Sequence, residues 1–210
     1  MKTLIHFLLV CFCVVAVSCT AKKSKSDIEI EFVQDTLNIG YTYWWPQSGP
    51  FIGGCGDELS LVFSGTVTKL QQPTDEAGPL YKSQEGIIEI NQVFKIKALE
   101  ENKYINQKFV STDCFDAMGL KSGDYVLVFC YDYEGAYSIP GEKSILKIDS
   151  FEDPLIESIR RYIDTDQNAV KLKKDVGLWA KKGLGRKLQE IIECAEEMKS
   201  DESVSSSYNQ

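Results

Sequence analysis

The chain offers few residues that could carry out acid–base or nucleophilic chemistry. Its single histidine is His6, which lies in an apolar N-terminal run that we expect to be removed. The remaining chain then has no imidazole for a Ser–His or Cys–His pair and no histidine ligand for zinc. Carboxylates remain, but Asp113 and Asp116 lie in one loop, where such residues are more often solvated than catalytic. We therefore predict no catalytic residue, no metal site and no cofactor.

The N-terminus has the pattern of an export signal that ends in a cysteine. Lys2 precedes an apolar run over residues 4–17, which is too short to span a bilayer. The residues Ala16-Val17-Ser18-Cys19 resemble the lipobox of bacterial lipoproteins, whose cysteine is diacylated and becomes the mature N-terminus. The resemblance implies palmitate or a similar acyl group on Cys19 and a lipid-anchored protein in the bacterial cell envelope, facing the periplasm or the cell surface. An ordinary signal peptide cut nearby is the alternative.

The cysteines outside the signal predict a disulfide, but their spacing does not show which cysteines form it. Of seven cysteines, Cys11 and Cys13 leave with the signal and Cys19 takes the lipid. The other four lie in an oxidising compartment and allow three pairings. These four are Cys55, Cys114, Cys130 and Cys194.

The aromatic residues Tyr43, Trp44 and Trp45 form the most unusual local sequence. Such side chains stack on sugars or grip peptides, and they are favoured as hot spots in interfaces. Neighbouring side chains on an extended chain point to opposite sides, so at least one of the two tryptophans should be exposed. We predict that these residues bind a protein or a glycan. The alternative is that they plug one end of the fold.

Three further motifs have simpler interpretations. The run 164–168 resembles the opening of a calcium-binding loop, with Asp175 at its twelfth position, but Ala169 replaces the glycine that the sharp turn needs. Residues 53–56 are glycine-rich but lack the Lys-Ser/Thr of a phosphate-binding loop. The basic run 181–187 lies at a helix entrance, which favours anions, although a solvated face is more common. We interpret residues 164–168 as a polar loop, residues 53–56 as a turn and residues 181–187 as a solvated surface.

Composition indicates one globular domain with a small appendage. The chain has 210 residues, of which 43% are hydrophobic and 26% charged. Removing residues 1–18 takes away one lysine, so that 22 basic residues against 31 acidic ones give a net charge of −9. An acidic domain repels the phosphate backbone, so we expect no nucleic acid as a partner.

Alternating apolar residues predict strands over the first two thirds of the chain. The run 125–131 is apolar on both faces and should be a central strand, and Gly65 should mark a bulge. Long bent strands without intervening helices favour a small closed barrel. The predicted strands cover residues 28–32, 58–70, 86–99, 125–131, 136–139 and 144–148.

Two helices should follow the strands, which makes the fold class mainly β with C-terminal α. Asp153 and Pro154 are a helix cap and a first turn, and a second apolar stripe runs from Leu184 to Met198. The predicted organisation is a signal peptide (1–18), a lipidated tether (19–26), a barrel (27–150), a helical extension (151–198) and a disordered tail (199–210).

Four segments together resemble the netrin-like, or tissue-inhibitor-of-metalloproteinases-like (TIMP-like), family in their order and spacing. They are Cys55–Lys69, Gln92–Ala98, Lys108–Cys114 and Leu120–Phe129. The resemblance covers residues 40–148, about half of the chain, and implies an OB-fold barrel. It also implies a disulfide between Cys55 and Cys114, and leaves Cys130 and Cys194 without a family counterpart.

The resemblance does not extend to the family's inhibitory chemistry. Animal members bind the protease zinc through a free N-terminal Cys-X-Cys, whereas Cys19 here would be blocked by lipid. In the family, the segment before the first barrel strand forms part of the inhibitory ridge, and Tyr43, Trp44 and Trp45 hold that position here. We therefore expect a membrane-anchored, non-enzymatic binding module for an envelope or extracellular protein or glycan. A carboxylate-dependent hydrolase and a structural envelope lipoprotein are the alternatives.

Overall fold

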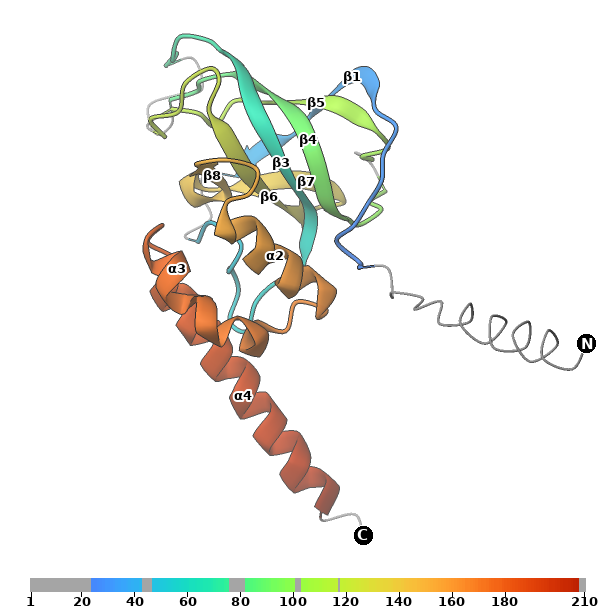
Figure 1. Ribbon diagram of the computed structural model, residues 1–210, viewed down its shortest axis with the longest axis vertical. Helices are drawn as coiled ribbons and strands as arrows, with labels where there is room; N and C mark the ends of the chain where they lie inside the picture. Colours follow the sequence, from blue (N-terminus) through green and yellow to red (C-terminus); the bar gives the residue numbers. More distant parts are fainter. Residues whose placement is uncertain (1–23, 43–46, 76–81, 101–102, 117, 208–210) are drawn as a thin grey trace, which may run out of the picture.

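The computed structural model describes residues 24–42, 47–75, 82–100, 103–116 and 118–207. Strands fill the first part and helices the last, as the sequence predicted (Figure 1). The strands are β1 (Val33–Asn38), β2 (Gly40–Thr42), β3 (Leu59–Leu70), β4 (Gly86–Ile96), β5 (Gln107–Thr112), β6 (Tyr125–Tyr133), β7 (Ala136–Pro140) and β8 (Ile145–Ile148). The helical elements are η1 (Glu142–Ser144), α2 (Pro154–Asp164), η2 (Ala169–Asp175), α3 (Val176–Ala180) and α4 (Gly185–Ser207).

The strands form one curled sheet whose two ends are consecutive in the chain. The order is β1-β5-β4-β3-β6-β7-β2, and β8 also pairs with β6. β1 and β2 pair in parallel with β5 and β7, while the other pairings are antiparallel. Only Ile39 separates β1 from β2, and its N–H donates to the Ser111 carbonyl at 2.9 Å. The continuous stretch from β1 to β2 therefore pairs with both edges of the curled sheet, β5 and β7.

Gly65 allows β3 and β4 to lie close together. The register between the two strands shifts between Ser64 and Gly65, which confirms the predicted irregularity. A Cβ on Gly65 would lie 2.4 Å from Ile88 Cγ2 and 2.7 Å from the Glu89 carbonyl oxygen. A larger residue would force the strands apart, so the glycine permits this sheet geometry.

β6 separates two hydrophobic cores, which explains why its sequence is apolar on both faces. Val126, Val128 and Cys130 point into the core enclosed by the curled sheet. Their neighbours Leu127, Phe129 and Tyr131 belong to a second core shared with the helices. The prediction of a central strand is confirmed, because β6 pairs with β3 on one side and with β7 and β8 on the other.

The helices cover the outer face of the sheet (Figure 1). α2 begins as predicted, with the Asp153 carboxylate accepting the Leu155 N–H at 2.9 Å. α4 continues to Ser207, past residue 198, where the sequence predicted the helical extension to end. Met198 is 55% exposed and is not part of the buried stripe, because α4 has by then run past the sheet.

Trp179 and the segment before β3 fill the space between sheet and helices. The Trp179 side chain is completely buried, and its indole N–H donates to Ser158 Oγ at 2.9 Å. The Phe51 ring packs edge-on against Trp179, with 4.8 Å between ring centroids, and lies 5.8 Å from the Tyr162 ring. Sequence analysis singled out neither Trp179 nor Phe51, although together they hold the segment from residue 47 to 57 under the helices.

The disulfide joins Cys55 to Cys194 and not to Cys114. Cys55 lies on the loop before β3, next to α4, whereas Cys114 is buried inside the curled sheet with Cys130. The sheet therefore separates Cys55 from Cys114, and the pairing implied by the family resemblance was wrong. The bond fastens the loop before β3 to the helix that covers it.

Replacing both Cys55 and Cys194 by alanine should lower the free energy of unfolding by about 2–5 kcal/mol, since the bond closes a very long loop of the unfolded chain. Urea unfolding under non-reducing conditions measures this. Glu193→Ala, at the exposed neighbouring position of α4, should change stability by less than about 0.5 kcal/mol. Peptide mapping that joined Cys55 to Cys114 would contradict the assignment.

Candidate functional site

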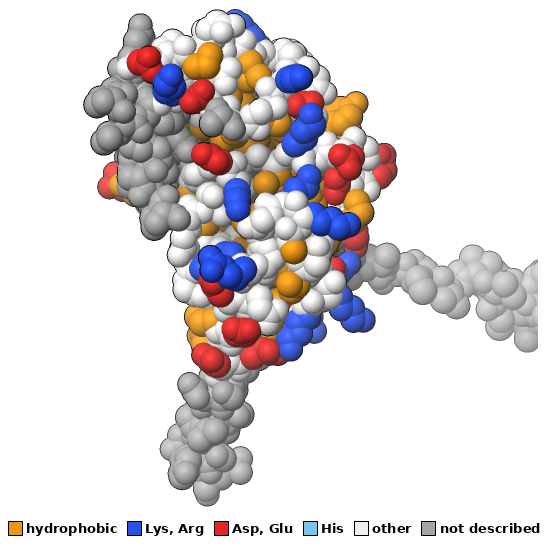
Figure 2. Space-filling view, turned by 90° about the vertical axis from the view of Figure 1, so that its left-hand side faces the viewer, with side chains coloured by type: hydrophobic (Ala, Val, Ile, Leu, Met, Phe, Trp, Pro, Cys, Tyr) orange, Lys and Arg blue, Asp and Glu red, His pale blue; other side chains and the backbone are white. Residues whose placement is uncertain are grey.

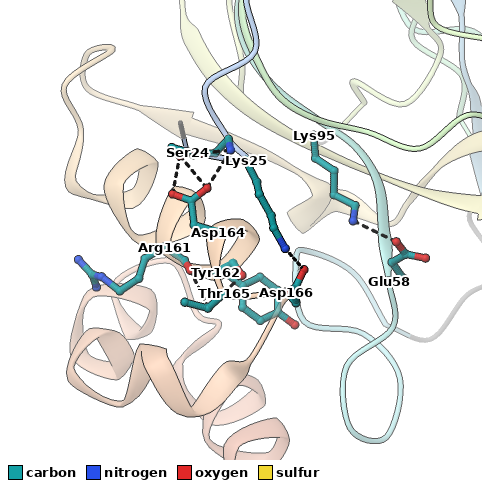
Figure 3. Close-up of polar contacts among 10 residues, drawn as sticks. Ser24, Lys25, Glu58, Lys95, Arg161, Tyr162, Asp164, Thr165 and Asp166 are labelled. Atoms are coloured by element: carbon teal, nitrogen blue, oxygen red, sulfur yellow. Dashed lines mark hydrogen bonds and ion pairs between the residues drawn. The ribbon is translucent and has the colours of Figure 1, made fainter. Parts of the chain in front are cut away.

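A cleft of about 540 Å³ opens where four separate parts of the chain meet (Figure 3). Its walls are the N-terminal segment around Lys25, the loop Gly56–Glu58, the end of β4 and the turn after α2. The lining residues are Lys25, Ile28, Gly56, Asp57, Glu58, Phe94, Lys95, Ile96, Ile163, Asp166 and Gln167. Such concave sites with a few convergent polar groups are the usual places where proteins bind ligands.

The Asp164 carboxylate fastens the N-terminal segment to the end of α2. The Ser24 hydroxyl lies 2.7 and 2.6 Å from its two oxygens, and the Ser26 backbone N–H donates to Oδ1 at 2.8 Å. A negative charge at a helix C-terminus is repelled by the helix dipole, so these donors offset an otherwise unfavourable position. Ser26 is completely buried, which makes residues 24–26 part of the fold and not of a free tether.

Hydrogen bonding decides the charge state of Asp164. Burial by itself raises the pKa of this carboxyl, but the hydrogen bonds from Ser24 and Ser26 outweigh burial and hold the pKa below its ordinary value. The ionised form is therefore the one that binds the N-terminal segment.

The turn after α2 is held in a conformation that side chains seldom adopt. Gln167 N–H donates to the Tyr162 carbonyl at 2.8 Å and Asp166 N–H to the Ile163 carbonyl at 3.1 Å, which is the Schellman ending of a helix. Asp166 and Gln167 both have positive φ, 54° and 57°, where glycine is usual. The Gln167 side chain accepts the Leu59 N–H at 2.8 Å. This contact ties the turn to the start of β3.

Two sets of ion pairs border the cleft. Lys25 pairs with Asp166 on one side, and Glu58 binds Lys95 at 3.0 Å on the other (Figure 3). Glu58 also binds Lys97 at 3.2 Å. The hydrogen bond from Lys95 is the main reason that the pKa of Glu58 lies below its ordinary value. These pairs are partly solvated, so they contribute little to stability but fix the charges at the rim.

The floor of the cleft is apolar. Phe94 and Ile163 are buried there, and Ile28 and Ile96 are half-buried. Ile28 comes from the predicted strand 28–32, which forms no strand ladder. Its alternation is nevertheless correct, because Ile28, Ile30 and Phe32 pack against the core inside the sheet.

A second, smaller cleft of about 350 Å³ lies at the entrance of α4, beside the basic run 181–187. It is lined by Gln47, Ser48, Lys143, Gly183, Leu184, Arg186, Lys187 and Glu190. Figure 2 shows basic and acidic side chains interspersed over one face of the molecule. Lys143 is already engaged, since its ammonium donates to the Gly183 carbonyl at 2.9 Å.

Several predicted site residues lie outside the described residues, namely Cys19, Tyr43, Trp44 and Trp45. The two ends of the aromatic segment are nevertheless fixed. Thr42 pairs with Pro140 in the sheet, and Gly49 N–H donates to Ser144 Oγ at 2.9 Å. Gln47 and Ser48, which follow the segment, line the smaller cleft.

The residues of the calcium-like motif do not converge on one site. Asp164 binds Ser24, Asp166 pairs with Lys25, and Asp175 binds Arg161 and Ser158, both at 2.7 Å. Within the described ranges, no group of three or more His, Cys, Asp or Glu residues is placed to hold a metal ion.

The larger cleft could not be predicted from the sequence, because its residues come from four distant segments. Lys25, Asp57, Glu58 and Lys95 belong to no local motif, and only the pairing of β3 with β4 brings Glu58 to Lys95. The polar run 164–168 was the one part of the larger cleft that the sequence had indicated as a possible site. Its role in the structure is to end α2 and to hold the N-terminal segment.

No family model and no curated protein matches the chain. In the part of the chain that the structure describes, no helix has the length and apolar character to cross a membrane.

Asp164→Asn should lower the free energy of unfolding by about 1 kcal/mol at pH 7, because it weakens charge-assisted hydrogen bonds. The folded pKa is lowered, so this contribution is complete above the unfolded value near 3.9 and is lost as the pH falls through the folded pKa. Urea unfolding of both proteins should therefore give stabilities that converge as the pH falls below the folded pKa. Asp35→Asn, at an exposed carboxylate, is the control. If Asp164→Asn were still less stable than the wild type by the same amount at low pH, the role of the Asp164 charge would be refuted.

Proposed function

We propose that this protein is an exported lipoprotein, anchored through acyl chains on Cys19, that acts as a non-enzymatic binding module for an envelope or extracellular protein or glycan. The observation that supports it is the docking of Ser24 and Ser26 on Asp164. Four residues separate Cys19 from Ser24, so the free tether would span at most about 17 Å. The domain would then stand close to the membrane with the larger cleft beside its anchor.

We further propose that the curled sheet is a netrin-like or TIMP-like OB-fold barrel. Support comes from the antiparallel pairings of β3 with β4 and β6, of β4 with β5, and of β6 with β7 and β8. With β7 and β8 taken as one interrupted strand, these are five strands, the number in an OB-fold. The additional stretch β1–β2 closes the side between β5 and β7.

The carboxylates of the larger cleft favour binding over hydrolysis. A carboxylate-dependent hydrolase needs one acid that stays protonated near neutral pH, which requires a raised pKa. The pKa of Glu58 is instead lowered by its hydrogen bond to Lys95, so this residue would be ionised and paired. A fixed ionised rim over an apolar floor suits recognition of a charged group.

The proposed contact for a large partner is the aromatic segment Tyr43–Trp45. The residues that follow it, Gln47 and Ser48, line the smaller cleft, so exposed aromatic side chains there would be continuous with a polar surface, as in many interfaces.

Trp44→Ala or Trp45→Ala should reduce recovery of a cross-linked partner from envelope extracts by tenfold or more, since truncating a central anchor costs about 2 kcal/mol. Thermal melts of the same variants should stay near the wild-type value. Ile105→Ala, at a side chain that is 70% exposed, is the matched control and should retain the partner. If both tryptophan variants lose stability and neither loses a partner while folded, the segment is only a plug.

A further inference from the structure

The disulfide between the loop before β3 and α4 lies at the surface of the protein. Cys55 is an exposed residue and Cys194 is half-buried. The free cysteines of the described residues differ sharply, since Cys114 is 2% and Cys130 0% exposed. Thiol–disulfide exchange requires an attacking thiolate to reach a sulfur atom, so exposed disulfides are the ones that external thiols reduce. Cys55 is therefore the point at which such an attack can begin.

The bond holds a loop whose own side chains all lie outside the core. None of residues 53–58 is buried, whereas Phe51 and Ile52 before them and Leu59 after them are. The Leu59 N–H also donates to the Gln167 side chain at 2.8 Å. Both ends of the loop are therefore fixed independently of the disulfide, and cutting the bond would free only the residues between them.

The backbone hydrogen bonds of this loop run to the residues just before it. The Gly53 N–H donates to the Gln47 side chain at 2.6 Å, and the Asp57 N–H donates to the Ile52 carbonyl at 2.8 Å. Neither bond reaches α4. The disulfide therefore supplies the covalent link between the loop and α4, beside the close approach of Gly56 to that helix.

The same loop forms one wall of the larger cleft. Gly56, Asp57 and Glu58 line the cleft, and of these Glu58 is held separately by its ion pair with Lys95. Gly53 and Gly56 have φ of 80° and 98°, a region that glycine enters without strain. Once the bond is cut, the backbone between these two glycines has wide conformational freedom. Reduction would thus loosen the part of the wall formed by Gly56 and Asp57.

We propose that the Cys55–Cys194 bond is a redox latch, which an external dithiol opens in the folded protein and which then releases one wall of the larger cleft. A thiolate of the dithiol attacks Cys55 Sγ, the bond to Cys194 breaks, and Cys194 leaves as a thiolate that takes up a proton. The second thiol of the reagent attacks the mixed disulfide and releases Cys55. The protein disulfide gains two electrons and two protons, and the dithiol is oxidised to a disulfide.

The two enclosed cysteines provide an internal reference for this chemistry. Burial raises the pKa of Cys114 to about 12 and holds the pKa of Cys130 well above its ordinary value. A buried thiol that stays protonated is inert toward alkylating reagents. Cys114 and Cys130 should therefore react only when the domain unfolds.

The test treats the purified, folded protein with increasing dithiothreitol, blocks thiols with iodoacetamide and maps the alkylated cysteines by mass spectrometry. We expect Cys55 and Cys194 to be alkylated together without denaturant, while Cys114 and Cys130 react only after urea is added. If Cys55 and Cys194 needed the same urea concentration as the enclosed pair, the bond would be sealed in the fold and the proposal would be overturned. Alkylation of all four cysteines without urea would also overturn it, because reduction would then unfold the domain.

Hydrogen exchange measured by mass spectrometry follows the release of the loop. Reduction should speed exchange of the amides of residues 53–57 at least about tenfold and leave those of β3 unchanged. The double variant Cys55→Ala and Cys194→Ala should show this pattern without a reductant, and Glu193→Ala should exchange like the oxidised wild type. Unchanged exchange at residues 53–57 contradicts the latch. Equal acceleration in β3 contradicts it as well, because the bond would then support the whole fold.

The proposal adds regulation to the proposed binding function and rests on that function only in taking the larger cleft as a binding site. Neither experiment needs a partner, so the two proposals can fail separately. A loop that does not respond to reduction, with capture still lost in Trp44→Ala or Trp45→Ala, refutes the latch alone. A responsive loop with undiminished capture in both tryptophan variants refutes the aromatic contact alone.

Discussion

The hydrogen bonds on Asp164 determine where the chain enters the fold, and most of the site depends on them. The carboxylate ends α2 and accepts from both Ser24 and Ser26. The chain then crosses from the helices to β1 with Ile28, Ile30 and Phe32 packed on the sheet. Without this contact Lys25 and Ile28 would not form a wall, and the larger cleft would be an open depression between β4 and α2.

The other walls depend on the packing of the helices against the sheet. Trp179 and Phe51 occupy the centre of the outer core, and the Cys55–Cys194 bond holds the adjoining loop to α4. That loop carries Gly56 and Asp57 into the cleft. The rim charges are thus placed by a rigid layer, as recognition requires, while the ion pairs themselves contribute little stability.

Features of the fold that depend only on neighbouring residues could be predicted from the sequence. The alternation in β3 and β4, the apolar run of β6, the bulge at Gly65 and the cap at Asp153 could all be predicted, because each depends on neighbouring residues. β1, β2 and β5 were not among the predicted strands. β1 is almost wholly exposed, and the parallel pairing of β1 and β2 has no local signature. The disulfide partner was wrong because Cys194 belongs to a helix that packs only in the tertiary fold. The larger cleft could not be predicted for the same reason, because its residues come together only in the tertiary fold.

We propose that the N-terminal contact holds the cleft next to a lipid anchor on Cys19. The most direct test places a nitroxide on Asp166→Cys or Lys121→Cys in lipidated protein on vesicles and measures relaxation by a nickel-chelating lipid. Leu59 binds Gln167 and Val67 binds Gly123, so the two labels are separated by about 25 Å along β3. We predict strong relaxation at 166, little at 121 and none at either in a Cys19→Ala background. Equal relaxation at both positions would contradict the account.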